Sequence, residues 1–179
     1  MPWKHVSGAL TDERAREILD AALADRGVRK LLGERFVHID TGEVRPEKGQ
    51  EQKPSDPLVV EVTFYSYSNN VTVEVKMAET KVRSATAVEV YQPPAPPEEV
   101  EMAAGLVRRD PQMSRKVAGL RARGIVTPGI RGRPGQGHRI LYVTFRPPGS
   151  NTPAYWATVD LTDQKVLAAG PAGPRRSRK

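Results

Sequence analysis

The sequence predicts an α+β protein built from two small units in tandem, each with an antiparallel sheet of three to four strands packed on one or two helices. Three observations support this prediction. An amphipathic helical pattern followed by strand-like segments occurs twice along the chain. The run 92–97 contains four prolines and separates the two occurrences. Short matching segments also recur in the two halves, in the same order.

The first predicted domain covers residues 1–92 and begins with a helix. Thr11 is suited to cap this helix, and Asp12 and Glu13 follow it at the positive end of the helix dipole. Apolar residues then recur at helical spacing on one face, namely Ala15, Ile18, Leu19, Ala22 and Leu23. We expect a further helical turn at 28–32, a short strand at 36–39, a polar loop at 45–57, and strands at 58–67, 71–77 and 82–91.

The prolines at 93–97 predict a stiff, extended linker, because proline lacks a backbone donor and has a fixed φ. The second domain is predicted at 98–170, and its first helix carries Val100, Ala103, Ala104 and Val107 on one face. Asp110 followed by Pro111 predicts the start of another helix, which presents Met113, Val117 and Leu120 and ends at Gly124. A loop at 127–137, strands at 138–146, 155–161 and 165–169, and a disordered basic tail at 171–179 complete the prediction.

The two halves of the chain resemble each other in sequence. Residues 62–64 and 143–145 are both Val-Thr-Phe, and residues 75–82 match residues 159–166 in pattern. The members of each pair are separated by nearly the same number of residues and fall on equivalent predicted strands. We therefore expect the two domains to be copies of one ancestral unit.

The composition excludes several classes of function. The 179 residues include no cysteine, which excludes disulfides, thiolate metal sites and a cysteine nucleophile. No apolar run approaches the roughly 20 residues that a membrane helix requires. The first residues lack the apolar core of a signal peptide. We expect a cytoplasmic protein with no membrane partner.

The positive charge is concentrated in one part of the chain. The formal net charge is +7, and Asp110 is the single acidic residue between positions 108 and 139. A basic segment of this kind is typical of contact with nucleic acid or another polyanion. The candidate contacts are Arg115, Lys116, Arg121, Arg123, Arg131, Arg133 and Arg139.

A second candidate surface consists of aromatic residues in the predicted strands. An open antiparallel sheet presents a face or an edge to a small molecule, a protein partner or a second copy of the chain. Such a partner would contact Tyr65 and Tyr67 in the first sheet, and Tyr142 and Trp156 in the second. Packing in the core or between the domains is the alternative role for each of these four residues.

The sequence predicts no catalytic, cofactor or metal site. His38 and Asp40 would share one face of a strand, with Glu43 nearby, but no second histidine lies close enough in the sequence to complete a metal site. The carboxylates within 98–101 and 160–163 suit a helix start and a turn better than an acid–base pair. The glycine-rich run 129–135 does not connect a strand to a helix, so it is not a phosphate-binding loop.

The junction between the two halves resembles a known family. Residues 91–94 are Tyr-Gln-Pro-Pro, Glu98, Glu99 and Val100 follow, and residues 108–111 are Arg-Arg-Asp-Pro. With Arg-Gly-Ile at 123–125 and the pattern at 159–166, this order is similar to the junction between the two N-terminal domains of copper amine oxidases. The resemblance covers residues 9–170 and implies two cystatin-like or PepSY-like units, the first similar to the N2 domain and the second to the N3 domain.

The resemblance does not bring the oxidase reaction with it. In that family, histidines hold the copper and the quinone forms from a tyrosine that follows asparagine, both in a C-terminal catalytic domain. This chain has His5, His38 and His138 and no Asn-Tyr pair, so no catalytic residue is carried over.

We therefore expect a non-catalytic binding or interaction protein of bacterial origin, which binds a small molecule or a protein in a biosynthetic pathway. Polyanion binding through 108–139, or an unrecognised enzyme that uses a cavity of the fold, are the alternatives.

Overall fold

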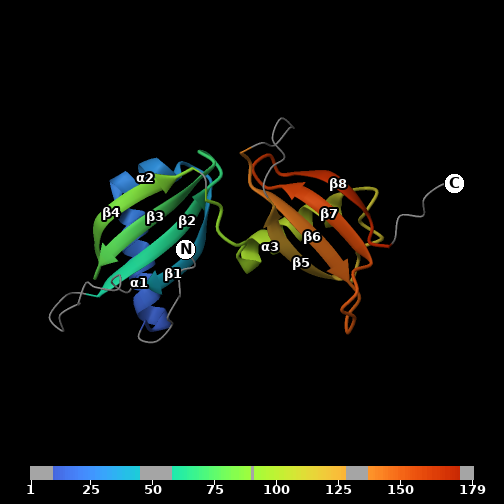
Figure 1. The fold of residues 1–179 in the computed structure, drawn as a ribbon, viewed down its shortest axis with the longest axis horizontal. Helices are drawn as coiled ribbons and strands as arrows, with labels where there is room; N and C mark the ends of the chain where they lie inside the picture. Colours follow the sequence, from blue (N-terminus) through green and yellow to red (C-terminus); the bar gives the residue numbers. More distant parts are fainter. Residues whose placement is uncertain (1–9, 45–57, 90, 128–136, 174–179) are drawn as a thin grey trace. The chain divides into compact units, whose positions relative to one another are not determined.

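A computed structural model describes residues 10–44, 58–89, 91–127 and 137–173 (Figure 1). The chain divides into two compact units, Met1–Gln92 and Pro93–Lys179. Each unit contains a four-stranded antiparallel sheet whose strands follow one another in sequence order. The predicted fold class, α+β with two tandem units of sheet and helix, is therefore confirmed. In the described segments, every helix is too short or too polar to span a bilayer.

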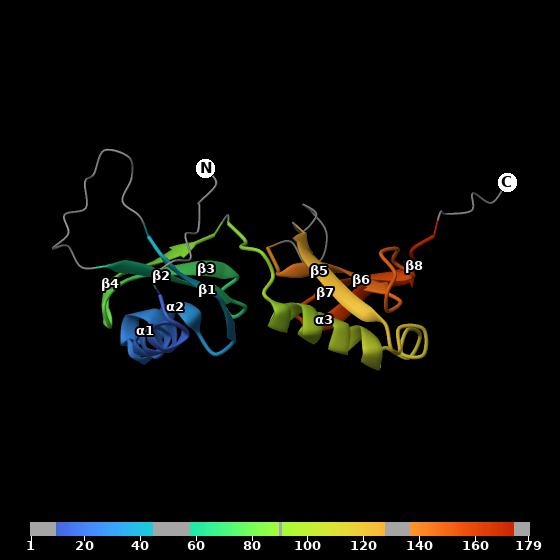
Figure 2. The same cartoon turned by 90° about the horizontal axis from the view of Figure 1, so that it is seen from below.

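The first unit packs its helices on one face of its sheet (Figure 2). Thr11 caps the first helix as expected, because its Oγ1 accepts a hydrogen bond from the backbone N–H of Arg14 at 3.3 Å. Asp25 caps the second helix through the backbone N–H of Val28 at 3.0 Å. The elements are α1 (Asp12–Ala24), α2 (Arg26–Leu32), β1 (Phe36–Glu43), β2 (Val59–Ser66), β3 (Val71–Ala78) and β4 (Lys81–Val88).

The core of the first unit lies between these helices and the sheet. Successive side chains of a strand face opposite sides, so alternate residues of β2 and β3 point toward the helices. Each large apolar side chain buried in this way contributes about 1.5–3 kcal/mol to stability. The buried set comprises Val60, Val62, Phe64, Val73, Val75 and Met77 from the strands, and Ile18, Ala22, Val28 and Leu32 from the helices.

A bulge in β1 changes the direction of its side chains. His38 pairs with Phe64, whereas Asp40 pairs with Thr63, so the register shifts between them. Phe64 and Thr63 are neighbours on β2 and face opposite sides of the sheet. The expectation that His38 and Asp40 share one face is therefore wrong, because the bulge places them on opposite faces.

Gly33 is the C-terminal cap of α2 and lies against the turn between β2 and β3. Its φ is 67° and its ψ is −154°, a conformation that is essentially restricted to glycine. A Cβ at this position would lie 2.7 Å from the Cβ of Ser68 in the turn between β2 and β3. The Oγ of Ser66 also donates to the carbonyl of Leu32 at 2.7 Å. The end of the helix is thus held directly against this turn.

The second unit packs one described helix on one face of its sheet (Figure 2). Pro97 is the first residue of this helix, where its missing N–H costs no hydrogen bond. The predicted apolar face is confirmed, since Ala103, Ala104 and Val107 are buried. The elements are α3 (Pro97–Arg109), β5 (Arg121–Thr127), β6 (Ile140–Arg146), β7 (Tyr155–Asp160) and β8 (Lys165–Pro171).

Two predicted features of this unit are wrong. Residues 111–119 form a series of turns and bends instead of a helix, although Met113 and Val117 are buried as expected. The segment that we expected to end this helix is strand β5, which pairs with β6 along its whole length. Its helix-facing residues include Ala122 and Gly124, which carry little preference for strands, so the partner strand decides its conformation. Strand β8 also extends to Pro171, into the expected tail.

Gly124 allows α3 to approach β5 closely. A Cβ added here would lie 3.1 Å from Cγ2 of Val100 on the helix and 3.4 Å from Cδ2 of Leu141. The side of β5 that includes Gly124 therefore faces α3 and the core. Its neighbours Arg123 and Ile125 point to the opposite side.

A buried ion pair holds the start of α3 to the start of β6. Arg139 and Glu99 are both fully buried. The guanidinium donates to the Glu99 carboxylate, from Nη2 at 2.7 Å and from Nε at 3.0 Å. It also donates to the carbonyls of Pro93 at 2.7 Å and Pro94 at 3.3 Å. The proline segment is thus bound to the second unit by hydrogen bonds.

The two sequence matches lie on equivalent strands. Residues 62–64 are in β2 and residues 143–145 are in β6, the second strand of each sheet. Residues 75–82 span the hairpin of β3 and β4, and residues 159–166 span the hairpin of β7 and β8. The repeated sequence pattern therefore corresponds to repeated topology.

Loss of one partner of the buried ion pair is expected to destabilise the second unit strongly. Glu99→Leu leaves a buried guanidinium without its counter-charge, and we expect a loss of about 3–5 kcal/mol in the free energy of unfolding. The double variant Glu99→Leu/Arg139→Met should recover much of this loss, because two apolar side chains then replace the ion pair. Urea unfolding followed by circular dichroism measures both values.

Arg108→Ala is the matched control for the ion pair. It removes the exposed pair between Arg108 and Glu101, whose atoms are 3.2 Å apart, and should cost less than about 1 kcal/mol. If Glu99→Leu costs no more than Arg108→Ala, the buried pair does not have the structural role described above.

Gly33→Ala and Gly119→Ala compare a crowded glycine with one that has open space around it. Both glycines have positive φ, 67° and 72°, but a Cβ at Gly119 would meet no atom within 4 Å. We expect Gly119→Ala to cost roughly 1–2 kcal/mol from backbone strain alone. Gly33→Ala should cost roughly 1–3 kcal/mol more, because its backbone conformation is essentially restricted to glycine and because Ser68 must also move. Thermal denaturation compares the two variants, and equal losses would contradict this account.

Candidate functional site

The face of the second sheet that points away from α3 carries charged and aromatic side chains. Gly124 defines the helix side, so alternate residues of β5 on the other side of the strand form the open face. The strand register places Arg123 opposite Thr144, and Thr144 opposite Trp156. The residues of this open face are Arg121, Arg123 and Ile125 on β5, Tyr142, Thr144 and Arg146 on β6, and Trp156 and Thr158 on β7.

Tyr142 and Trp156 form a stacked pair on the open face. Their ring centroids are 6.0 Å apart and their planes differ by 19°. Both side chains are half-buried. Gly170 on β8 pairs with Trp156, and a Cβ there would lie 3.6 Å from the indole. The indole therefore lies close to the β8 backbone at Gly170, and it forms a stacked aromatic pair with Tyr142.

Three arginines lie beside this aromatic pair. Arg121 on β5 pairs with Arg146 on β6, and Arg123 follows Arg121 on the same face. Arg121 and Arg123 are exposed, and the buried Nε of Arg146 has no hydrogen-bond partner within the described residues. Among those residues, none of the three forms an ion pair. The sequence has no Asp or Glu from Pro111 to Val159, and the nearby Glu101 of α3 forms an ion pair with Arg108.

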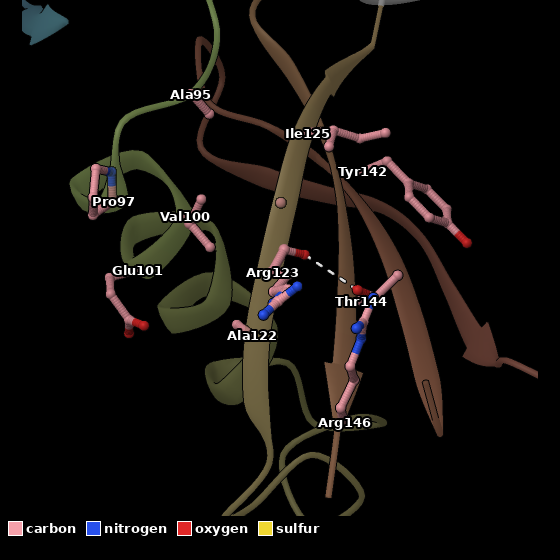
Figure 3. A pocket seen from close by; sticks show the side chains of 11 residues that line it. Ala95, Pro97, Val100, Glu101, Ala122, Arg123, Ile125, Tyr142, Thr144 and Arg146 are labelled. Atoms are coloured by element: carbon pink, nitrogen blue, oxygen red, sulfur yellow. Dashed lines mark hydrogen bonds between the residues drawn. The ribbon is translucent and has the colours of Figure 1, made fainter. Parts of the chain in front are cut away.

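Two adjoining grooves follow this face and the outer edge of β5. The larger has a volume of about 610 Å³ and is shown in Figure 3, with Val100 and Glu101 of α3 on one side of β5 and Tyr142 and Thr144 on the other. The smaller, of about 250 Å³, is lined by the three arginines together with Ser150 and Asn151. Arg123 and Arg146 line both grooves. The face therefore combines a stacked aromatic pair with a cluster of arginines.

The four predicted aromatic residues differ in their exposure to solvent. Tyr142 and Trp156 lie together on the open face, whereas Tyr65 is fully buried and Tyr67 is 5% exposed. The rings of Tyr65 and Tyr67 are in edge contact at 5.5 Å, and the Arg35 guanidinium lies 5.5 Å from the Tyr67 centroid. The expectation that Tyr65 and Tyr67 form an exposed surface is wrong, because both side chains are buried.

The predicted polyanion contacts also differ in their exposure to solvent. Arg121 and Arg123 are on the open face, and Arg115 and Lys116 are exposed in the turns before β5. Arg139 is fully buried against Glu99 and is not a surface contact, which corrects the prediction. Arg131 and Arg133 lie outside the described residues.

Sequence reasoning missed Arg146. Its position at the end of a predicted strand, four residues after Tyr142, was the available signal, because residues that differ by an even number share a face. The position of Arg146 beside Arg121 also depends on the pairing of β5 with β6. Without β5, the sequence did not indicate that Arg121 lies directly beside Arg146.

A second polar cluster closes the hairpin between β7 and β8. Asp160 is fully buried, and its carboxylate contacts Nδ1 of His138 at 2.8 Å and accepts the backbone N–H of Asp163 at 3.0 Å. The ligand atoms of His138, Asp160 and Asp163 lie within 4.8 Å of one another, a spacing that a metal ion could use. Lys165 Nζ already donates to the Asp163 carboxylate at 2.6 Å, and this hydrogen bond raises the pKa of Lys165. These contacts stabilise the turn between β7 and β8.

The fold has a likeness among solved structures, to a copper-containing benzylamine oxidase from Hansenula polymorpha. The TM-score is 0.51 and the sequence identity is 12%, and the likeness covers 88% of this chain and 28% of the oxidase chain. The sequence matches no protein-family model, and comparison with curated proteins gives no match. At this identity the likeness concerns the fold alone. The chain is thus similar in fold to a part of a copper amine oxidase.

Proposed function

We propose that this chain is a non-catalytic binding protein that holds its ligand on the open face of the second sheet. The proposal rests on one observation. Three arginines without ionic partners in the described residues lie on the same face as the stacked pair of Tyr142 and Trp156. The likeness in fold to an amine oxidase is consistent with two repurposed domains of the N2 and N3 type.

The side chains of this face favour a ligand with an anionic group and a planar ring. Arginine presents a rigid fork of donors that matches carboxylate and phosphate, and charge-assisted hydrogen bonds are about twice as strong as neutral ones. The outer face of the Tyr142–Trp156 stack suits stacking of a further aromatic ring. Each of the two features recognises a different part of such a ligand.

The same side chains favour binding over catalysis. The charged groups of the open face are arginines, which remain protonated at all physiological pH values. They supply fixed positive charge and hydrogen-bond donors, but they do not transfer protons. General acid–base catalysis requires groups that gain and lose protons near the working pH.

Trp156 provides a direct measure of ligand binding. The chain has two tryptophans, Trp3 and Trp156, so a Trp3→Phe variant has Trp156 as its single fluorophore of this kind. We expect adenosine monophosphate to quench this fluorescence, because its base stacks on the indole while its phosphate meets the arginines. Ribose 5-phosphate lacks the aromatic base, and adenosine lacks the charged phosphate. Each should therefore bind more weakly than the complete nucleotide.

Variants of the face separate its two contributions. Arg123→Ala should weaken binding of the nucleotide by roughly tenfold or more, as expected for the loss of a charge-assisted hydrogen bond. Gly170→Ile should displace the indole and weaken binding, because a branched side chain would enter the space that the ring occupies. Arg83→Ala, which removes an exposed arginine of the first unit, is the control. If no anionic aromatic probe changes the Trp156 fluorescence, the proposed function is wrong.

A further inference from the structure

We propose that the ligand of the open face is single-stranded nucleic acid, with phosphates along Arg121, Arg123 and Arg146 and an unpaired base on Trp156 and Tyr142. This inference rests on the proposed function and names the ligand class of the same site. Four features of the second unit support it.

The first feature is the extent of the face. Arg123 and Trp156 lie in one cross-strand row with Thr144 between them. Neighbouring strands are about 4.8 Å apart, so the backbones that carry the arginine and the indole are roughly 10 Å apart. Arg121 and Arg146 add a further row of positive charge beyond them. A sugar–phosphate backbone with a base on each sugar can place phosphates at the arginines and a base at the aromatic pair.

The second feature is the openness of the face. Pockets for small molecules typically bury about 70–90% of the ligand surface. Here Ile125 is 63% exposed at the edge of the sheet, and the larger groove is lined by residues from both sides of β5. A ligand in this groove continues past the edge of the sheet instead of being enclosed. This geometry favours a polymer over a single nucleotide.

The third feature is the charge that leads up to the face. Arg115 and Lys116 are exposed in the turns that run directly into β5, which begins at Arg121. They are therefore connected by a short stretch of chain to the end of the sheet where Arg121 pairs with Arg146. Glu101 is the acidic residue among those that line the two grooves, and it forms an ion pair with Arg108. Several phosphates can be neutralised together, as polyanion binding requires.

The fourth feature distinguishes a single strand from a duplex. Aromatic side chains on a sheet bind nucleic acid by stacking on bases, and bases within a duplex are already stacked and paired. The stacked pair of Tyr142 and Trp156 is half-buried, and the indole of Trp156 lies beside Gly170. Only an unpaired base can extend this stack. Arginines alone would not make this distinction.

The inference is tested by fluorescence anisotropy on the full chain, with a labelled oligothymidylate of about 16 nucleotides, at the upper end of known site sizes for one such module. A duplex of the same length and inorganic polyphosphate are the competitors. We expect the single strand to bind more tightly than either competitor. The logarithm of the affinity should fall linearly as the logarithm of the salt concentration rises.

Two variants separate stacking from charge. Trp156→Leu keeps an apolar side chain and should weaken oligonucleotide binding by on the order of tenfold, as expected for one stacked base, with the salt slope unchanged. Arg123→Ala should weaken binding and reduce the salt slope by about 0.7, the value for one phosphate contact with a single strand. Trp156→Phe retains a ring and should restore most of the affinity. Arg83→Ala should change neither quantity.

The outcomes distinguish this inference from the proposed function. If the single strand, the duplex and polyphosphate bind equally and Trp156→Leu has no effect, the face is a general polyanion surface and the inference is overturned. If adenosine monophosphate quenches Trp156 and binds as tightly as the oligonucleotide, the proposed function stands and the inference fails. If neither compound binds, both are wrong.

Discussion

The second unit depends on the buried ion pair between Arg139 and Glu99. The guanidinium connects the first turn of α3, the carbonyls of Pro93 and Pro94, and the start of β6. A buried charge without a partner is costly, so these segments are constrained to meet in one arrangement. Glu99 is also near the N-terminus of α3, where the helix dipole stabilises a carboxylate. The ion pair therefore joins the start of α3 to the start of β6 and to the proline segment.

Coverage of one face by α3 leaves the other face available for binding. Gly124 permits close packing of the helix on β5, and the opposite side of the same strand carries Arg121, Arg123 and Ile125. The core and the proposed binding face are thus two sides of one strand, separated by the alternation of side chains. A single element determines both stability and surface chemistry. The proposed ligand site requires no insertion or loop beyond the basic fold.

The two units share a topology but differ in how they use their aromatic residues. Tyr65 and Tyr67 of the first unit are buried, whereas Tyr142 and Trp156 of the second are half-exposed and stacked on each other. Repetition of a fold does not impose repetition of function, because function depends on the side chains placed on the fold. The same reasoning applies to the amine oxidase, whose likeness to this chain lies in the fold.

The sequence by itself determined the local elements of this protein. The helical stripe of α1 with its cap at Thr11 and the alternating pattern of β3 depend on neighbouring residues, so local sequence patterns predict them. The prolines before α3 mark the end of one pattern and the start of the next. Only the tertiary structure decided that β5 is a strand, that Arg139 is buried, and that Tyr65 is buried while Tyr142 is partly exposed. Each of these depends on a partner distant in the sequence: β6 for the strand, Glu99 for the arginine, and the packing around each sheet for the tyrosines. Pairing across a sheet and burial of charge are non-local interactions, so the sequence pattern at one position does not contain them.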